Sequence, residues 1–386
     1  MYNILTLNKI AACGTDQLPA DMFTVSSDAA APDGILLRSA DMHSYDPPKS
    51  LLAVGRAGAG VNNIPVEKYA DLGIVVFNSP GANANAVKEL VIAALLLSSR
   101  NINAGINWVQ GLAGQAGVAK LVEAGKGQFV GPEIAGKKLG VVGLGAVGVL
   151  VANACHSLGM DVYGYDPFLS VDSAWRLSRG VHKAPGVDAV VSECDYITIH
   201  IPLNKETKGM FNADMFKKVK KGARILNFSR GELADNAAVK DALQNGLISC
   251  YVTDFPNEEL LGAEGVIPIP HLGASTPESE DNCAVMAAEE LRDYLLYGVI
   301  RNSVNYPDCD MTYTGKKRIC VHHKNIPNVV ASLTALLASR GMNIDNMSNR
   351  SKGAYAYTVI DVDDEKLNGT EENLRAVEGV IRVRVI

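Results

Sequence analysis

The sequence predicts an α/β protein with two doubly wound parallel-sheet domains and a small βαββαβ unit at the carboxyl end. Short apolar runs of strand length recur along the first three quarters of the 386-residue chain. Many are apolar without a break, which is typical of parallel strands buried on both faces. A glycine-rich turn stands between a strand and a helix near the middle. The last seventy or so residues alternate strand and helix patterns in a different order.

The first strands lie between residues 3 and about 80. Apolar runs alternate there with turn-rich segments, and we expect strands in ILTLN, GILLRSA, LLAVGRAG and GIVVFNSP. The segment AVKELVIAALLLSSR, 86–100, is apolar nearly all round, which predicts a long buried helix.

Strand and helix signals repeat more regularly between residues 138 and 272. We expect strands in KLGVVG, DVYGYD, YITIHIP, ARILNFS and ISCYVTDF, separated by helical stretches such as AAVKDALQNG. This alternation predicts a second doubly wound sheet. Another helix is expected over 279–298.

The carboxyl-terminal part begins after a segment without apolar periodicity. Residues 301–315 contain Pro, Asp, Asn and Gly, which predicts a linker. Residues 316–386 then read strand, helix, strand, strand, helix, strand, a ferredoxin-like pattern.

Composition excludes several classes of protein. The net charge of −6 argues against a nucleic-acid surface, and no apolar run reaches the ~18 residues of a membrane span. The seven cysteines have neither paired nor metal-ligand spacing, so we expect reduced thiols, no metal and a cytoplasmic location. The first residues lack the basic region of a secretory signal.

The segment VVGLGAVG predicts a dinucleotide site in a Rossmann-like domain. Gly143, Gly145 and Gly148 form G-x-G-x-x-G between an apolar strand and a helix. The first two glycines permit a tight turn beside a pyrophosphate, the third allows close packing, and the helix N-terminus attracts the phosphates. Asp166 ends the next strand, where an acid accepts hydrogen bonds from ribose hydroxyls and favours NAD over NADP.

Three candidate catalytic residues lie beyond strand ends: Arg230, Glu258 and His271. Such positions converge at the carboxyl edge of a parallel sheet. His271 would take the hydroxyl proton during oxidation of an alcohol, Glu258 would orient it, and Arg230 would bind a substrate carboxylate. His200 is the rival base, although its apolar strand favours a packed residue near the cofactor.

With these motifs in place, nearly the whole chain resembles the D-isomer-specific 2-hydroxyacid dehydrogenase family, as judged from VVGLGAVG with YDP, HIPLNKETKGM, NFSRGEL and PHLGAST. The stretch from LLAVGRAG to NAVKEL is close to members that act on 3-phosphoglycerate. The resemblance implies catalysis by Arg230, Glu258 and His271. It implies NAD contacts at Gly143, Gly145, Ala146, Val147, Gly148, Asp166, His200, Pro202, Phe228, Ser229, Asp254, Gly273 and Ala274. It also implies substrate contacts at Arg38, Ser39, Arg56, Gly58 and Asn83.

The resemblance implies a discontinuous substrate domain, residues 1–83 with 278–307, around an NAD domain of residues 84–277. The final unit, 316–386, resembles an ACT domain, a regulatory module that binds amino acids at subunit interfaces. His323, Asn325 and Asn343 would then contact L-serine as a feedback inhibitor. A homodimer or homotetramer is expected.

Three departures from the family pattern affect these expectations. Thr253-Asp254-Phe255 replaces the usual Asp-Val-Phe, which displaces the aspartate expected at the nicotinamide amide by one residue. Glu259 replaces the proline that normally follows the catalytic glutamate, so Glu258 or Glu259 is left as the partner of His271. Asn328 replaces a glycine in the ACT-like segment and still tolerates a left-handed backbone.

The resemblance implies NAD-dependent oxidation of 3-phosphoglycerate at C2, the first step of L-serine biosynthesis, as the expected function. Two alternatives remain open from the sequence: another D-2-hydroxyacid dehydrogenase, such as a glyoxylate or hydroxypyruvate reductase, and a non-catalytic regulator that senses NAD. The presence of Arg230, Glu258 and His271 together favours an enzyme.

Overall fold

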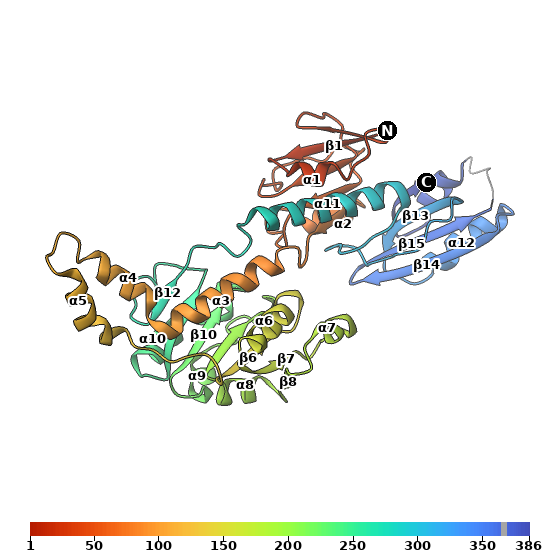
Figure 1. The fold of residues 1–386 in the computed structure, drawn as a ribbon. Coiled ribbons are helices and arrows are strands. Elements are labelled where there is room, and N and C mark those ends of the chain that lie inside the picture. The colour runs from red at the N-terminus through yellow and green to blue at the C-terminus, as the bar shows by residue number, and fades with distance from the viewer. Residues whose placement is uncertain (364–368) are drawn as a thin grey trace. The chain divides into compact units, whose positions relative to one another are not determined.

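The computed structural model describes residues 1–363 and 369–386, which form two compact units. The first unit contains Met1–Asn83 and Pro277–Ile386, and the second contains Ala84–Thr276 (Figure 1). The inserted unit therefore interrupts the first one in sequence, and each is described by itself below.

The first unit begins with a five-stranded parallel sheet in the order β2-β1-β3-β4-β5. The strands are β1 (Tyr2–Leu7), β2 (Phe23–Ser26), β3 (Gly34–Leu37), β4 (Ala53–Arg56) and β5 (Val75–Asn78). The helices are α1 (Ala12–Thr15), α2 (Val66–Asp71) and α11 (Pro277–Tyr297). α11 lies so close to β4 that a Cβ on Gly55 would stand 2.9 Å from the carbonyl oxygen of Ala287. The long helix thereby returns to cover the amino-terminal sheet.

A terminal sheet completes the first unit. Its strands are β13 (Lys317–Lys324), β14 (Ile344–Lys352), β15 (Tyr355–Val362) and β16 (Val380–Val385), antiparallel in the order β14-β15-β13-β16. Its helices are α12 (Val329–Ser339) and α13 (Thr370–Arg375). This order is the ferredoxin-like order that the strand and helix pattern predicts.

Residues 301–315, which were expected to form a linker, contain no helix or strand, but several of their side chains are buried. Ser303, Asn305 and Tyr306 are buried, and the Asn305 side chain bonds the backbone of Ile74 and Val76 along β5. The segment is polar because its side chains form hydrogen bonds with buried backbone groups, which need partners. Its polar composition therefore does not indicate a solvated linker.

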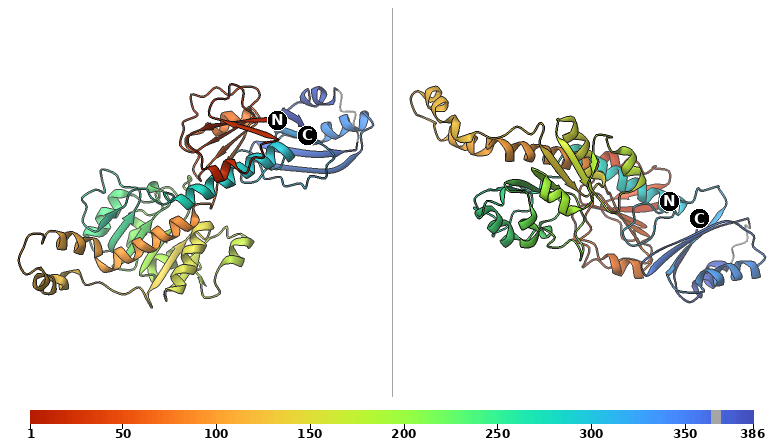
Figure 2. Two further views of the ribbon diagram at one scale, coloured as in Figure 1. Left: turned by 45° about the horizontal axis from the view of Figure 1, so that its top comes forward. Right: turned by 90° about the horizontal axis from the view of Figure 1, so that it is seen from below.

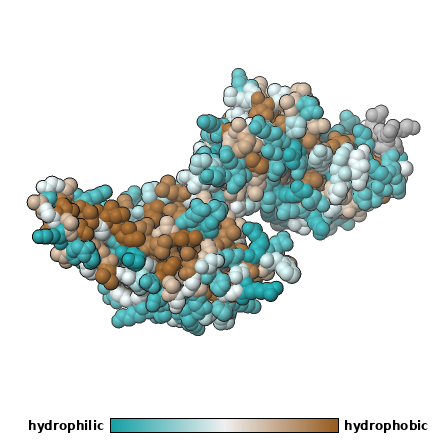
Figure 3. Space-filling view, in the orientation of Figure 1, coloured by the Kyte–Doolittle hydropathy of each residue, from teal (hydrophilic) through white to brown (hydrophobic). Residues whose placement is uncertain are grey.

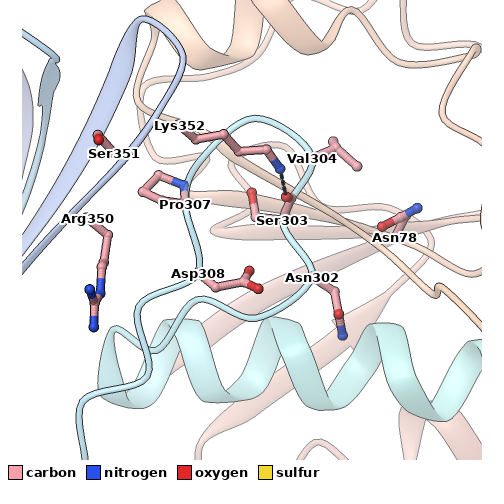
Figure 4. A pocket seen from close by; sticks show the side chains of 9 residues that line it. All are labelled: Asn78, Asn302, Ser303, Val304, Pro307, Asp308, Arg350, Ser351 and Lys352. Atoms are coloured by element: carbon pink, nitrogen blue, oxygen red, sulfur yellow. Dashed lines mark hydrogen bonds between the residues drawn. The ribbon is translucent and has the colours of Figure 1, made fainter. Parts of the chain in front are cut away.

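The terminal sheet is joined to the amino-terminal sheet by this segment and by a shared core. Cys320 and Tyr357 of the terminal sheet belong to the same apolar cluster as Ile4 and Leu291. Lys352 Nζ donates to the carbonyl oxygen of Ser303 at 2.7 Å, beside a cavity of about 640 Å³ (Figure 4). These contacts join the terminal sheet and the amino-terminal sheet into one compact unit.

The second unit contains a seven-stranded parallel sheet in the order β12-β11-β10-β9-β6-β7-β8. Figure 2 shows this unit, coloured from orange to green, in two further views. The strands are β6 (Lys138–Val142), β7 (Asp161–Tyr165), β8 (His182–Lys183), β9 (Tyr196–Ile199), β10 (Ala223–Asn227), β11 (Ile248–Thr253) and β12 (Val266–Pro268). One core packs α3 (Ala84–Arg100) and α6 (Ala146–Ser157) against the strands. Another core includes α8 (Val187–Glu193), α9 (Ala213–Lys218) and α10 (Asn236–Gln244). The predicted doubly wound fold is confirmed.

The second unit also carries elements that the sequence pattern did not indicate. α4 (Ile102–Gln110), α5 (Val118–Gly125) and the 3₁₀ turn η1 (Lys126–Phe129) follow α3, and neither α4 nor α5 contains a buried residue. We call this segment the arm. The short α7 (Val171–Arg176) and the 3₁₀ turn η2 (Gly231–Leu233) complete the unit.

Candidate active site

The glycine turn between β6 and α6 has the geometry of a phosphate cradle. Gly143 has φ +94°, and a Cβ there would lie 2.4 Å from the carbonyl oxygen of His200. A Cβ on Gly148 would lie 2.0 Å from the carbonyl oxygen of Gly143. Space at Gly145 is open, and the helix start receives no side-chain cap. Backbone N–H groups at the start of α6 are therefore available to an anion, so this turn fits a dinucleotide pyrophosphate.

The end of β7 provides the adjoining nucleoside site. Asp166 accepts hydrogen bonds from the backbone N–H of Leu144 and of Phe168, both at 2.8 Å. A cavity of about 290 Å³ beside it is lined by Leu144, Asp166, Leu177 and Lys183, among others. The carboxylate is thus fixed at the mouth of a partly apolar cavity, which suits an adenosine with free ribose hydroxyls.

Arg230 lies immediately beyond β10 and is held by its backbone. The buried Asn227 amide donates to the Arg230 carbonyl at 2.9 Å and to the Tyr251 hydroxyl at 3.1 Å. The guanidinium donates to the Ser229 carbonyl at 2.6 Å. A half-buried guanidinium that spends one donor on its own loop keeps further donors for an anionic ligand.

His271 lies in the segment that follows β12, next to the end of β11. Its ring packs against the Phe255 ring with centroids 4.7 Å apart. Phe255 in turn approaches the Arg230 loop, since a Cβ on Gly231 would stand 3.2 Å from the Phe255 Cβ. The structure thus brings both His271 and the Arg230 loop against Phe255.

The carboxyl group in this cluster belongs to Asp254, the first residue after β11. Burial raises its pKa to about 6, while the charges of His271 and Arg230 oppose that rise. Asp254 is 2% exposed, and its Oδ1 has no hydrogen-bond partner among the described residues. Its Oδ2 lies 3.5 Å from the position of a Cβ on Gly273. The structure therefore gathers Arg230, Asp254 and His271.

Glu258 occupies a different environment. Its side chain is exposed, and it forms no hydrogen bond or ion pair with any described residue. Glu259 is exposed as well. The structure brings neither carboxylate into a bonded contact with His271.

His200, the rival base, is anchored inside the sheet edge. Its Nε2 pairs with the Thr198 hydroxyl at 2.9 Å, and desolvation lowers its pKa to about 4. Such a ring stays neutral near pH 7 and accepts a proton poorly, so the geometry favours His271 as the base.

The remaining expected cofactor residues follow the same edge of the sheet. Ser229 donates to the Ile201 carbonyl at 2.6 Å, which links the loops after β9 and β10. The other residues of this group stand in the glycine turn or just beyond β9, β10 and β12: Ala146, Val147, Pro202, Phe228, Gly273 and Ala274.

The expected substrate residues lie at strand ends of the first unit. Arg56 ends β4, and its guanidinium lies against Gly58, where a Cβ would stand within 2.3 Å of a guanidinium nitrogen. Arg38 and Ser39 follow β3, and Arg38 pairs with Glu280 at 2.7 Å. Asn83 is the last residue of the first segment of this unit. Two guanidinium groups thus lie at the carboxyl ends of neighbouring strands.

Two asparagines that the sequence did not single out position these groups. Asn8 Oδ1 accepts hydrogen bonds from the backbone N–H groups of Arg38, Ser39 and Ala40 at 2.9–3.1 Å. Asn63 Oδ1 accepts from Arg56 Nε at 3.2 Å. Asn227, which the sequence also did not single out, instead donates from its amide to the Arg230 carbonyl. Asn8 and Asn227 stand at strand ends, and that position was the available signal, whereas Asn63 lies in the loop between β4 and α2.

The expected effector residues are spread over the terminal sheet. His323 is buried, and its ring nitrogens pair with the Lys324 carbonyl and the Thr358 hydroxyl at 2.8 and 2.9 Å. Asn325 follows β13, whereas Asn343 precedes β14 and bonds Asp363 at 3.3 Å. The register places these two asparagines at opposite ends of the sheet, separated by the eight residues of β13, roughly 25 Å. One subunit does not bring them around one ligand.

Comparison with known proteins identifies the family. The model of the D-isomer specific 2-hydroxyacid dehydrogenase NAD-binding domain matches residues 92–273. D-3-phosphoglycerate dehydrogenase of Escherichia coli strain K12 is 30% identical over 351 residues, 88% of this chain and 82% of the relative. The Archaeoglobus fulgidus enzyme of the same name is 35% identical over 291 residues, 72% of this chain and 52% of the relative. The chain spans about half the length of that relative and of those from Synechocystis and Bacillus subtilis.

Solved structures share the fold at lower identity. The NAD⁺-bound 3-phosphoglycerate dehydrogenase of Entamoeba histolytica has a TM-score of 0.58 and 24% identity, covering 79% of this chain and 98% of that one. The NADPH-dependent glyoxylate/hydroxypyruvate reductase of Sinorhizobium meliloti has a TM-score of 0.65 and 22% identity, covering 79% and 98%.

The glycine turn, the doubly wound sheet and these matches define an NAD-binding dehydrogenase class. The chain belongs to the D-isomer-specific 2-hydroxyacid dehydrogenase family. Within that family it is similar over most of its length to proteins named D-3-phosphoglycerate dehydrogenase. Among the described residues, no helix combines the length and apolar character required for a membrane span.

Proposed function

We propose that the protein is an NAD-dependent oxidoreductase that oxidises 3-phospho-D-glycerate at C2 to 3-phosphohydroxypyruvate, the first step of L-serine biosynthesis. The convergence of Arg230 and His271 around Asp254, on the sheet that carries the glycine turn, is the observation that supports it most directly. A base and a carboxylate-binding cation are the two groups that this reaction needs.

The cofactor site is assigned to residues that fit its chemistry. The turn from Gly143 to Gly148 would hold the pyrophosphate, and Asp166 would accept from the ribose hydroxyls. When bound, NAD supplies the hydride acceptor.

The protein's own groups handle charge and protons. Arg230 binds the substrate carboxylate and polarises the oxygen on C2 as it becomes a carbonyl. His271 removes the hydroxyl proton during oxidation and returns it in the reverse direction. Arg56 and Arg38 are assigned to the phosphate, whose two negative charges match a pair of guanidinium groups.

NADH formation monitored at 340 nm with 3-phosphoglycerate tests this function. We expect turnover by the unmodified protein, and a loss of kcat/KM of about 10³-fold in Arg230→Ala and in His271→Ala, in line with general-base and charge contributions. Lys217→Ala, which breaks one exposed ion pair on α9, is the matched control and retains activity. Unimpaired turnover in either site variant would contradict the assignment.

The alternatives give different results in the same assay. Activity on glyoxylate or D-lactate without activity on 3-phosphoglycerate would indicate another D-2-hydroxyacid dehydrogenase. Tight NADH binding without turnover on any 2-hydroxyacid would indicate a regulator. The two arginines at the carboxyl ends of β3 and β4 support the phosphorylated substrate over both, since a phosphate suits a pair of guanidinium groups.

L-Serine is proposed as the effector of the terminal sheet. Because Asn325 and Asn343 lie at opposite ends of one sheet, a serine site that uses both requires residues from two subunits. Serine should therefore inhibit turnover and raise the melting temperature only in the assembled protein. Asn343→Ala should abolish both effects, whereas Asn373→Ala on the exposed face of α13 should preserve them; unchanged inhibition in Asn343→Ala would exclude this site.

A homo-oligomer is proposed, with the arm as a contact between copies. Figure 3 shows apolar side chains gathered over α3, α4 and α5. On α4 the exposed Ile102, Ile106 and Val109 recur at helical spacing and form one apolar face. A second copy of the arm would cover such a face, as a self-complementary interface requires.

Sedimentation velocity tests the oligomer. Ile106→Glu should reduce the mass of the particle, because the charge is costly to bury. Val171→Glu on α7, where the side chain is also exposed, is the matched control and should leave the mass unchanged. An intact oligomer in Ile106→Glu would rule out the arm as the contact between copies.

The cytoplasm is the proposed location, in keeping with seven cysteines that are all free thiols in the structure.

A further inference from the structure

The carboxylate of Glu280, in the first turn of α11, lies beside the charges assigned to the substrate phosphate. Its Oε1 pairs with Arg38 Nη1 at 2.7 Å. Arg38 directly follows β3, and Arg56, the second arginine of the phosphate site, ends the neighbouring strand β4. The side chains of the ion pair are 41% and 46% exposed. An ion pair so exposed is weak, so a competing anion can displace the carboxylate.

Buried contacts between α11 and the strand ends fix the place of Glu280. The Ser79 hydroxyl, which is fully buried, lies 3.1 Å from the carbonyl oxygen of Arg56 and 2.9 Å from that of Cys283. Cys283 is three residues beyond Glu280, about one turn of the helix. The backbone that carries Glu280 is therefore joined to the end of β4 inside the core of the first unit.

The thiol of Cys283 shows that the three charged groups gather at one place. Burial raises the pKa of this thiol, and a hydrogen bond with Ser279 opposes the rise. Among the charges that act on the thiol, those of Arg56 and Arg38 lower its pKa and that of Glu280 raises it. Two positive charges and one negative charge thus lie around the first turns of α11.

We propose that Glu280 sets the affinity of the phosphate site, because its carboxylate competes with the substrate phosphate for the Arg38 guanidinium. This inference rests on the proposed function. A phosphate monoester carries a charge of about −1.5 to −2 at pH 7. It must either displace the carboxylate from Arg38 or bind beside a like charge, and each course weakens its binding. Glu280 takes no part in the chemistry at C2.

A purely structural role for Glu280 predicts the opposite effect on binding. An acid in the first turn stabilises a helix through the helix dipole. A carboxylate that only held the Arg38 side chain in its binding conformation would improve phosphate binding by pre-organisation. Removing the charge would then weaken phosphate binding, whereas competition predicts that binding tightens. The sign of the change separates the two roles.

Steady-state kinetics with 3-phosphoglycerate and NAD measure this sign. Glu280→Gln removes the charge with little change in shape, so KM for 3-phosphoglycerate should fall by about fivefold. The phosphate is remote from the reacting carbon and binds alike in the ground and transition states, so kcat should change by less than about twofold. A KM that rises or stays unchanged in Glu280→Gln would overturn the inference.

Asp281→Asn is the matched control for the charge of the helix start. Asp281 is the next residue of α11, is exposed, and acts on Cys13 of α1. Its removal should leave KM within about twofold, because its charge is not paired with a phosphate-site arginine in any contact of the described residues. An equal fall of KM in Asp281→Asn and in Glu280→Gln would mean that only the general charge of the helix matters, and would overturn the inference.

A titration with inorganic phosphate followed by ³¹P NMR gives a readout that needs no turnover. Saturating NADH covers the glycine turn, the other candidate anion site, so the phosphate that still binds reports on the two arginines. The Kd of phosphate should fall about fivefold in Glu280→Gln and rise at least about tenfold in Arg38→Ala; an unchanged Kd in either variant would overturn the inference. If phosphate binding tightens in Glu280→Gln but 3-phosphoglycerate is not oxidised, the proposed substrate fails while the competition between Glu280 and phosphate stands.

Discussion

At Glu290 of α11, burial determines the charge of a single carboxyl group. Its Oε1 accepts a hydrogen bond from Asn302 at 2.7 Å, while Oε2 is buried and has no partner among the described residues. Desolvation raises the pKa of Glu290 to about 8 from the ordinary 4.5. The folded protein therefore holds this proton at neutral pH, where the unfolded chain has released it.

Glu290 should make the stability of the first unit fall as pH rises. Below about pH 4 the carboxyl group is protonated in both the folded and the unfolded state. Above that pH the unfolded chain releases the proton, whereas the folded state keeps it until about pH 8. The free energy of unfolding therefore declines between these limits. The decline attributable to this group is of order 5 kcal/mol, since the pKa of Glu290 rises from 4.5 to about 8.

Urea unfolding followed from about pH 5 to pH 9 measures this effect. Glu290→Gln should remove most of the decline, since the amide never ionises, whereas Glu289→Gln, the half-buried neighbour, should keep it. Equal pH profiles for Glu290→Gln and the unmodified protein would contradict the burial argument.

Part of the candidate active site could be predicted from patterns of residues in the sequence. The glycine turn and the strand-end positions of Arg230 and His271 could be predicted because parallel strands place their carboxyl ends at one edge. The burial of Asp254 and the exposure of Glu258 could not be predicted, because motif alignment counts residues while burial depends on which loop packs over them. The displacement of the aspartate by one residue was visible in the sequence, but the burial of Asp254 was not.

At the scale of elements, periodicity predicted the parallel strands, the long helix α3 and the βαββαβ order of the terminal sheet. It did not predict the arm, because a helix with one apolar face toward solvent has no core to mark it. It also described residues 301–315 as a linker. Asn305 is buried there because its side chain bonds the backbone of Ile74 and Val76, a tertiary property that composition does not record.

A buried ion pair within the terminal sheet includes an arginine that also bonds the end of α11. Arg318 and Asp361 are 0% exposed and pair through Nε–Oδ1 at 2.7 Å and a second bond at 2.9 Å. Arg318 also donates to the carbonyls of Tyr297, Met311 and Thr312, each at 2.8 Å. All five donors of this guanidinium are used, so β13 and β15 are tied to the end of α11.

Breaking this pair should be far costlier than breaking an exposed one. Arg318→Met leaves the Asp361 charge buried and should lower the free energy of unfolding by about 3–5 kcal/mol. Arg375→Met, which breaks an exposed pair with Glu371, should cost less than about 1 kcal/mol. Adding Asp361→Leu to Arg318→Met should restore part of the loss; a double variant less stable than the single would contradict the charge argument.

At the scale of the whole molecule, the division into two units predicts two unfolding transitions. Each unit has its own apolar clusters, and the terminal sheet shares its cluster with the amino-terminal sheet. The first unit should therefore unfold as one body that includes the terminal sheet, and the second unit as another.

Differential scanning calorimetry separates the two by changing each unit alone. NADH at about 100 times its Kd should stabilise the second unit by about 2.7 kcal/mol and raise its transition, because only the folded unit carries the glycine turn in its binding geometry. Lys352→Ala, which removes the bond to the Ser303 carbonyl, should lower the other transition and leave the NADH-sensitive one in place (Figure 4). Glu371→Ala, at an exposed pair on α13, is the control and should move neither transition measurably. A single transition that responds equally to NADH and to Lys352→Ala would mean that the two units unfold together, and that their cores are not independent.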